Sequence, residues 1–404
     1  MKTPSHKWTF RNRLRAGAFG WRASKLASQR LKEAVSEIKA VNRKAPRTAA
    51  DGAILLMEKL WPAMAHVDSS SGALGNAVNK TVHPLIDIIV AAPVDERRRE
   101  QWLERLWSAV EEDGVDYLWE VSERWGELCG TPERASQAAD ELLPTVRLSW
   151  SEKHGGYFRG TPACLSCLLA AGRHRELLEL IDTAPYLSWH YRRYGVLALA
   201  AMGRADEAIR YARDSMGLND SPAAIARACE ALLLEADRCD EAYHRFALEA
   251  NRAGTHLATF RAIRKQYPQK APREILDDLI ATTPDDEGRW FATAKTLGFF
   301  DLAAELAHRS PVDIGTLLRA ARDHLDRAPE FALDSATAAL HWMARGRFYE
   351  IKAGDVWQAR DYALQSAAAI GRLEPTRKLI DGLIDSDKTD AFVRKQLGLY
   401  SQIM

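Results

Sequence analysis

Residues 203–212 read GRADEAIRYA, and turns of the same type recur through the second half of the chain. In each one, an apolar run ends at a Gly or an Asp, and a second helical pattern follows. The turn positions are Gly172, Gly203, Asp237, Gly298 and Gly371, separated by steps of 31, 34, 61 and 73 residues. A period in the low thirties, with each longer step covering two units, predicts an array of helical hairpins.

The residues of the turn agree with this prediction. Gly203 can adopt the left-handed backbone conformation that ends a helix, at little steric cost. Asp206 follows three residues later, where its carboxylate can cap the N-terminus of a second helix. Ala208 is small enough to let two helices approach closely. The pattern therefore predicts a helix, a turn and a second helix in each unit.

The stretch 194–220 resembles a tetratricopeptide (TPR) unit, in which a Gly-containing turn precedes an acidic pair, an Ala and an aliphatic or aromatic residue. Residues 229–250 are similar to the same pattern. Gly195 and Val196 stand where that family usually has Leu and Gly, and the terminal Pro is displaced to Pro222. The resemblance implies a degenerate TPR-like array whose first helices line a concave surface.

The rest of the chain also carries apolar residues with a period near 3.6, and almost none with a period of 2. Asp95 and Thr131 are expected helix N-caps, and Pro46 and Pro93 are expected to end helices. We therefore expect an all-α fold, a right-handed α-solenoid of TPR-like helical hairpins preceded by a helical N-terminal region. The expected divisions are a basic arm and helix (1–48), an N-terminal helical region (49–150) and the TPR-like array (151–404).

Composition excludes several classes of protein. Of the 404 residues, 47% are hydrophobic and 27% are charged, the balance of an ordinary globular chain rather than a disordered or fibrous one. Five cysteines are too few for a disulfide framework, so a reducing compartment and a cytoplasmic location are expected. No apolar run approaches the roughly 18 residues of a membrane-spanning helix. We expect no membrane association.

The net charge of +1 hides an asymmetry. Residues 1–48 contain thirteen Lys and Arg and two acidic residues, a charge of +11, and the remaining 43 basic and 53 acidic residues give 49–404 a charge of −10. A basic arm on an acidic body can fold onto that body, or it can bind phosphate or an acidic protein. The first 32 residues contain no acid, which also fits an organelle transit peptide.

Aromatic residues alternate with arginines in this arm. In proteins that bind single strands, aromatic side chains stack on bases while guanidinium groups hold phosphates. The same aromatic residues can instead anchor the arm to its own domain, and Trp8 and Trp21 are open to both interpretations. The candidate contacts for a nucleic acid or an acidic partner are Arg11, Arg13, Arg15, Trp21, Arg22 and Lys25.

Three groups of residues could suggest chemistry. Cys164 and Cys167 form a CxxC without a second pair or histidines at ligand spacing, so we interpret them as buried thiols on an apolar helix. His66, Asp68 and the serines that follow are interpreted as loop and capping residues, because no base is placed to activate a serine. The sequence GGYFRG at 155–160 lacks the lysine of a phosphate-binding loop and is interpreted as a junction. We expect no catalytic residue, metal or cofactor.

The sharpest binding hypothesis concerns the first helices of the repeats. The TPR resemblance implies that His190 and Arg193 lie on the concave surface, and counting from the Asp237 turn places Arg227 there one repeat later. Two guanidinium groups one repeat apart suit a carboxylate-bearing peptide. The alternative is ordinary solvated charge on a helix.

These observations predict a non-enzymatic scaffold or adaptor that binds a protein partner along its concave surface, because helical arrays present extended surfaces of this kind. The alternative is a nucleic-acid-associated protein that uses the basic arm. An enzyme with a site near His66 or the CxxC pair is a third interpretation.

Overall fold

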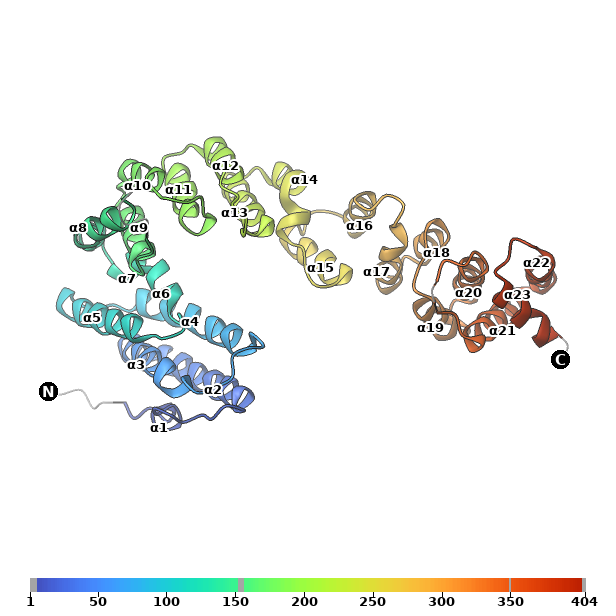
Figure 1. The fold of residues 1–404 in the computed structure, drawn as a ribbon, viewed down its shortest axis with the longest axis horizontal. Coiled ribbons are helices and arrows are strands. Elements are labelled where there is room, and N and C mark those ends of the chain that lie inside the picture. The colour runs from blue at the N-terminus through green and yellow to red at the C-terminus, as the bar shows by residue number, and fades with distance from the viewer. Residues whose placement is uncertain (1–5, 152–155, 349, 402–404) are drawn as a thin grey trace. The chain divides into compact units, whose positions relative to one another are not determined.

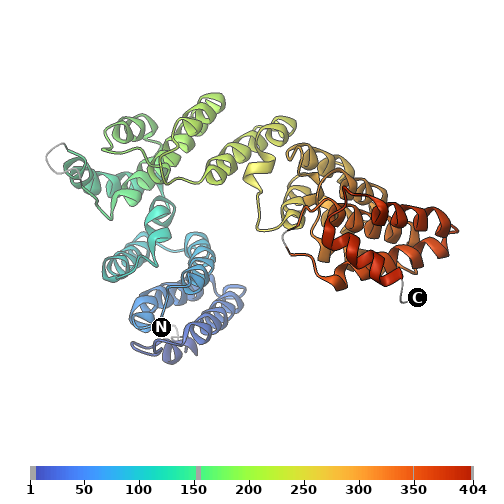
Figure 2. The same cartoon turned by 45° about the vertical axis from the view of Figure 1, so that its right-hand side comes forward.

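The computed structural model describes residues 6–151, 156–348 and 350–401, and within these ranges every regular element is a helix. Figure 1 shows the helices in chain order, and Figure 2 shows the same helices from a second direction. The expected all-α class is therefore confirmed. The chain forms two compact units, Met1–Asp237 and Arg238–Met404.

The first unit contains thirteen helices among the described residues. They are α1 (Phe10–Arg13), α2 (Ser24–Asn42), α3 (Pro46–Met64), α4 (Ala73–Ala91), α5 (Glu96–Glu112), α6 (Trp119–Glu123), α7 (Trp125–Cys129), α8 (Pro132–Ser149), α9 (Thr161–Ala170), α10 (His174–Asp182), α11 (Trp189–Ala201), α12 (Ala205–Arg213) and α13 (Pro222–Glu235). The junction expected near residue 150 falls inside this unit, where α8 and α9 pack against each other.

The second unit contains ten α-helices and one 3₁₀ helix among the described residues. They are α14 (Cys239–Ala250), α15 (His256–Gln266), α16 (Pro272–Ala281), η1 (Glu287–Trp290), α17 (Phe291–Thr296), α18 (Phe300–Arg309), α19 (Ile314–His324), α20 (Pro329–Ala344), α21 (Ala353–Ala369), α22 (Leu373–Asp385) and α23 (Ala391–Ser401).

The repeated turns have the backbone that their residues predict. The φ angles of Gly172, Gly203, Asp237, Gly298 and Gly371 are 71°, 74°, 56°, 83° and 71°, all in the left-handed region. Each of the two longer sequence steps contains one further helix pair, α15 with α16 and α19 with α20. Within the units, the helices joined by these turns pack against each other as hairpins: α9 with α10, α11 with α12, α17 with α18, and α21 with α22.

Neighbouring helix pairs pack on one another within each unit. In the first unit, α11 contacts its own partner α12 and also α9, α10 and α13. In the second, α20 contacts α18, α19 and α21. Within each unit these helices thus pack on neighbouring pairs, as helical repeats do. The continuous right-handed solenoid stays a prediction.

Several expected helix ends are also found, and the expected cap at Asp206 is wrong. The side chains of Asp95 and Thr131 accept hydrogen bonds from the backbone N–H groups of Arg98 and Arg134. The helix expected to stop before Pro46 ends at Asn42, and Pro46 itself begins α3, because proline fits the first helical position, where its N–H would have no partner. Asp206 does not cap α12; it lies in the first turn, where its charge favours the positive end of the helix dipole.

The N-terminal arm folds onto its own body. Trp8, Phe10, Leu14 and Phe19 are buried in the core of the first unit. The indole of Trp8 lies against Gly52 of α3, where an added Cβ would come within 2.2 Å of the ring. The sequence left open whether the aromatic residues of the arm anchor it to its own domain or stack on bases. The burial of Trp8 and Phe10 favours anchoring.

No helix in the described part of the chain is both long and apolar enough to cross a bilayer.

Candidate binding pocket beside helix α11

The residues expected to line the partner groove fall in two places. His190 and Arg193 lie in the first turns of α11, and both approach Glu123 at the end of α6. Arg227 lies on α13 with an exposed side chain and makes no ion pair with any described residue. The structure therefore brings together the first two residues, around a carboxylate that the sequence did not single out.

Glu123 is the acceptor at the centre of this cluster. Its side chain is only 5% exposed, its Oε1 forms an ion pair with the Arg193 guanidinium, and the same oxygen lies 3.1 Å from Nδ1 of His190. The Tyr194 hydroxyl donates to the Glu123 carbonyl oxygen at 3.0 Å, and burial raises the pKa of this phenol. Arg193 also lies over the Tyr194 ring, 4.9 Å from its centroid. The chain itself thus provides the carboxylate that His190 and Arg193 were expected to take from a partner.

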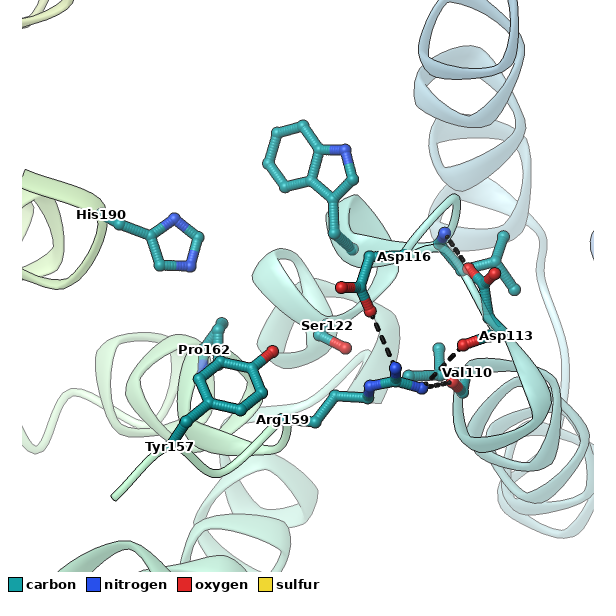
Figure 3. Close-up of a pocket in the computed structure, with 10 residues that line it drawn as sticks. Val110, Asp113, Asp116, Ser122, Tyr157, Arg159, Pro162 and His190 are labelled. Atoms are coloured by element: carbon teal, nitrogen blue, oxygen red, sulfur yellow. Dashed lines mark hydrogen bonds and ion pairs between the residues drawn. The ribbon is translucent and has the colours of Figure 1, made fainter. Parts of the chain in front are cut away.

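His190 also lines a pocket of about 340 Å³ between α5, the loop after α5, α6, the start of α9 and α11. Figure 3 shows His190 on one side of this pocket, with Asp116 and Arg159 across from it. The lining residues are Val110, Asp113, Asp116, Leu118, Trp119, Ser122, Tyr157, Arg159, Pro162 and His190.

Arg159 organises one wall of the pocket. Its Nη1 donates to the carbonyl oxygens of Val110 and Asp113, both at 2.9 Å, so it satisfies acceptors that the end of α5 leaves open. Its Nη2 forms an ion pair with Asp116 at 3.0 Å. This guanidinium is therefore committed to its own chain.

Asp113 holds the loop that follows α5. It is buried, and its carboxylate accepts from the backbone N–H groups of Leu118 at 2.7 Å and Val115 at 3.2 Å. Burial raises the pKa of the Asp113 carboxyl, although these N–H groups act in the opposite direction. Its role is to fix the turn that presents Trp119 and Asp116 to the pocket.

The pocket contains one buried polar group without a partner. Ser122 is 3% exposed, and its hydroxyl makes no hydrogen bond. A buried unpaired hydroxyl costs free energy. Ser122 also lacks the neighbouring base that a nucleophilic serine requires.

Aromatic side chains form the exposed walls. Trp119 is 40% exposed and Tyr157 is 68% exposed. Tyr191, next to His190, packs against Trp150 and Tyr186, with ring centroids 5.4 Å and 6.0 Å away. Aromatic faces beside carboxylates can bind a cation through both the ring quadrupole and charge.

Sequence reasoning missed most of this pocket. The spacing of Trp119 is that of a core residue, but the short α6 turns its ring outward. Arg159 lies in the segment interpreted as a junction, and of that segment Gly155 is outside the described residues. Glu123 and Ser122 carried no signal beyond their position near the end of a helical pattern. The pocket is formed by segments up to 80 positions apart, from Val110 to His190.

The arm residues named as contacts are placed in two ways. Arg13 pairs with Glu33 at 2.8 Å. The others form no ion pair with the described residues, and all are exposed: Arg11, Arg15, Trp21, Arg22 and Lys25.

The CxxC thiols are buried. Cys164 and Cys167 lie on α9, which packs against α7 and its buried Cys129. Burial raises the pKa of the Cys164 thiol to about 12. The contact with Cys129, together with burial, raises the pKa of Cys167 as well. Asp68 accepts from the backbone N–H of Ser70 at 3.0 Å and forms a local turn, while His66 is exposed.

Comparison of the sequence with models of known protein families and with curated proteins finds no match.

Proposed function

We propose that this protein is a non-enzymatic scaffold or adaptor that binds a protein partner through the pocket beside α11. The observation that supports this most is the pair of exposed aromatic side chains, Trp119 and Tyr157, on the walls of one pocket. Exposed aromatic residues around a concave site are typical of residues that anchor a partner.

The state of the polar groups argues against catalysis. The Ser122 hydroxyl has no base within hydrogen-bond distance, Arg159 is occupied by acceptors of α5, and His190 is engaged by Glu123. A nucleophile needs a neighbouring base, and an oxyanion site needs uncommitted donors. We therefore favour binding over chemistry at this site.

The pocket chemistry favours a cationic side chain from the partner. Arg193 and His190 already have a carboxylate partner in Glu123, so an incoming carboxylate would have to displace it. Asp116 is more than half exposed despite its ion pair with Arg159, and it shares the pocket with the rings of Trp119 and Tyr157. A lysine or arginine that enters between these rings meets aromatic faces and acceptor oxygens together.

We place this activity in the cytoplasm. The five cysteines form no disulfide, and four of them are buried, which suits a reducing compartment.

The test is selection of random linear peptides displayed on phage against the full chain. The enriched peptides should share one lysine or arginine, and Trp119→Ala should weaken their binding about tenfold. Trp21→Ala is the matched control, because Trp21 is also exposed but lies outside the pocket, and it should leave binding unchanged.

The outcomes separate the two parts of the proposal. Enriched peptides that bind Trp119→Ala as tightly as the wild type contradict the pocket but not the scaffold. No enrichment contradicts the scaffold itself. A shared carboxylate in place of the cation overturns the proposed partner chemistry and favours the His190 and Arg193 hypothesis.

A further inference from the structure

One face of α2 is basic along its whole length. Lys25, Lys32 and Lys39 are spaced by seven residues, and Arg43 follows four residues later at the end of the helix. Seven residues are close to two helical turns, so these four cations project from one side of the helix. Lys25 and Lys39 are separated by about 21 Å along the helix axis.

No acid interrupts this face. The positions between the cations on the same side are Gln29 and Ser36, both exposed and uncharged. The buried residues of α2, Ala27, Leu31, Ala34 and Ile38, lie on the opposite side. The face is therefore a continuous polar and basic stripe, which we call the α2 stripe (Lys25, Gln29, Lys32, Ser36, Lys39 and Arg43).

The two acidic residues of α2, Glu33 and Glu37, bind residues outside the α2 stripe. Glu33 pairs with Arg30 at 2.7 Å and with Arg13 at 2.8 Å. Glu37 accepts from the backbone N–H and hydroxyl of Thr9, at 2.8 Å and 2.6 Å. The docked arm thus occupies the helix acids, while the four cations of the α2 stripe have no ion-pair partner among the described residues.

A hollow also opens on the stripe. It measures about 320 Å³ and is lined by Ser24, Lys25, Ser28, Gln29 and Lys32 of α2, with Ala73 at the start of α4. Two ammonium groups beside hydroxyl and amide groups can hold a phosphate, since lysine, serine and glutamine side chains all contact phosphate oxygens in nucleic-acid complexes.

We propose that the α2 stripe binds the phosphate backbone of a nucleic acid. A row of cations over about 21 Å matches a regular polyanion rather than a single anion. The stripe carries no apolar side chain, whereas a helix that lies on a membrane needs an apolar face beside its basic one. Trp21, 68% exposed and in the turn that precedes α2, offers a ring on which a base can stack.

This inference differs from the interpretation based on the arm alone. Trp8 and Phe10 are buried and cannot stack on bases, so the arm does not work as an extended strand binder. The arm binds the two acidic residues of α2, since Arg13 pairs with Glu33 and Thr9 donates hydrogen bonds to Glu37, and neither acid pairs with a cation of the α2 stripe.

The experiment measures the affinity of the full chain for a labelled single strand and a labelled duplex by fluorescence anisotropy. Four phosphate contacts predict an affinity loss of about 10²-fold between roughly 50 and 200 mM salt. The triple variant Lys25→Gln, Lys32→Gln, Lys39→Gln should reduce the slope of log affinity against log salt by about 2.7 for the duplex. All three side chains are exposed, so the variant should fold, and circular dichroism verifies that it does.

Two matched variants remove the same charge elsewhere. Arg175→Gln, Lys265→Gln, Lys378→Gln changes three exposed cations on other helices and should leave the salt slope unchanged. Arg11→Gln, Arg15→Gln, Arg22→Gln tests the arm. The proposal is overturned if the arm variant loses binding and the stripe variant does not. It is also overturned if the wild type binds neither nucleic acid, or binds only vesicles of anionic lipid.

Discussion

Trp8 of the arm lies directly against Gly52 of α3, so closely that one added Cβ would reach within 2.2 Å of the indole. The close packing of the Trp8 indole on Gly52 attaches the basic arm to the core of the first unit. It explains why the arm, which belongs to a segment (1–48) with a charge of +11, is part of the first unit.

Gly52→Ala tests this contact. The new methyl forces Trp8 to move, and overpacking of this kind costs about 1–3 kcal/mol, which exceeds the roughly 1 kcal/mol gained by replacing a helical glycine. Urea denaturation should show the loss, and trypsin should cut the arm faster. Gly75→Ala is the control, because open space surrounds that α4 glycine. Equal stability of the two variants would contradict the close packing of Trp8.

The second prediction concerns Glu123. Its replacement by Gln leaves the Arg193 guanidinium without its carboxylate in a largely buried site, and we expect a loss of about 2–4 kcal/mol by chemical denaturation. The double variant Glu123→Leu, Arg193→Met removes both charges and should recover much of this loss. A Glu123→Gln chain as stable as the wild type would show that the pair is not needed for the fold.

Two buried serines give a matched pair. Ser122→Ala removes a hydroxyl that has no partner, so stability should stay equal or rise by up to about 1 kcal/mol. Ser166→Ala removes the acceptor of the Gly126 N–H, 3.0 Å away, and should cost about 1–2 kcal/mol. Thermal denaturation of both variants checks this. If Ser122→Ala lowers the melting temperature more than Ser166→Ala does, the Ser122 hydroxyl makes a hydrogen bond after all.

The left-handed turns give a fourth prediction. Gly203→Ala places a Cβ at a φ of 74° and should destabilise the chain by about 1–2 kcal/mol. Gly254→Ala is the control, since Gly254 lies in open space without a positive φ, and it should have little effect. At the equivalent turn, Asp237→Gly should stabilise the chain, because Asp237 pays a steric cost at its φ of 56°. Denaturation midpoints measure all three.

The last prediction is a pH dependence in the second unit. Burial lowers the pKa of His256, which packs edge-on against Trp290 at 4.6 Å, below its ordinary value of 6.5. The unfolded chain therefore binds a proton more readily than the folded one, and stability should fall as the pH drops below 6.5.

His256→Gln should reduce this pH dependence, measured as the change in urea midpoint between neutral and mildly acidic buffer. Burial also lowers the pKa of His341, so His341→Gln should likewise reduce the pH dependence of stability. His66 is exposed, and His66→Gln is the control. If the urea midpoint of His256→Gln changes between the two buffers as much as that of the wild type, His256 does not cause the pH dependence.

The sequence by itself determined the helices, the left-handed turns and the number of helix pairs between successive turns. These depend on local chemistry, since a glycine at a left-handed φ and an apolar stripe of period 3.6 act within a few residues. The wrong assignment at Asp206 is local too, because an acid favours a helix start at more than one position of the first turn.

Only the tertiary structure decided which charges stay free. His190 and Arg193 looked available in the chain, but Glu123, almost 70 residues earlier, pairs with both. Folding buried Trp8 and Phe10 of the arm, but it left Arg11, Arg15 and Arg22 exposed, like the cations of the α2 stripe. Whether a charge is paired depends on distance in space, and a pattern along one helix does not contain the partner that another helix brings to it.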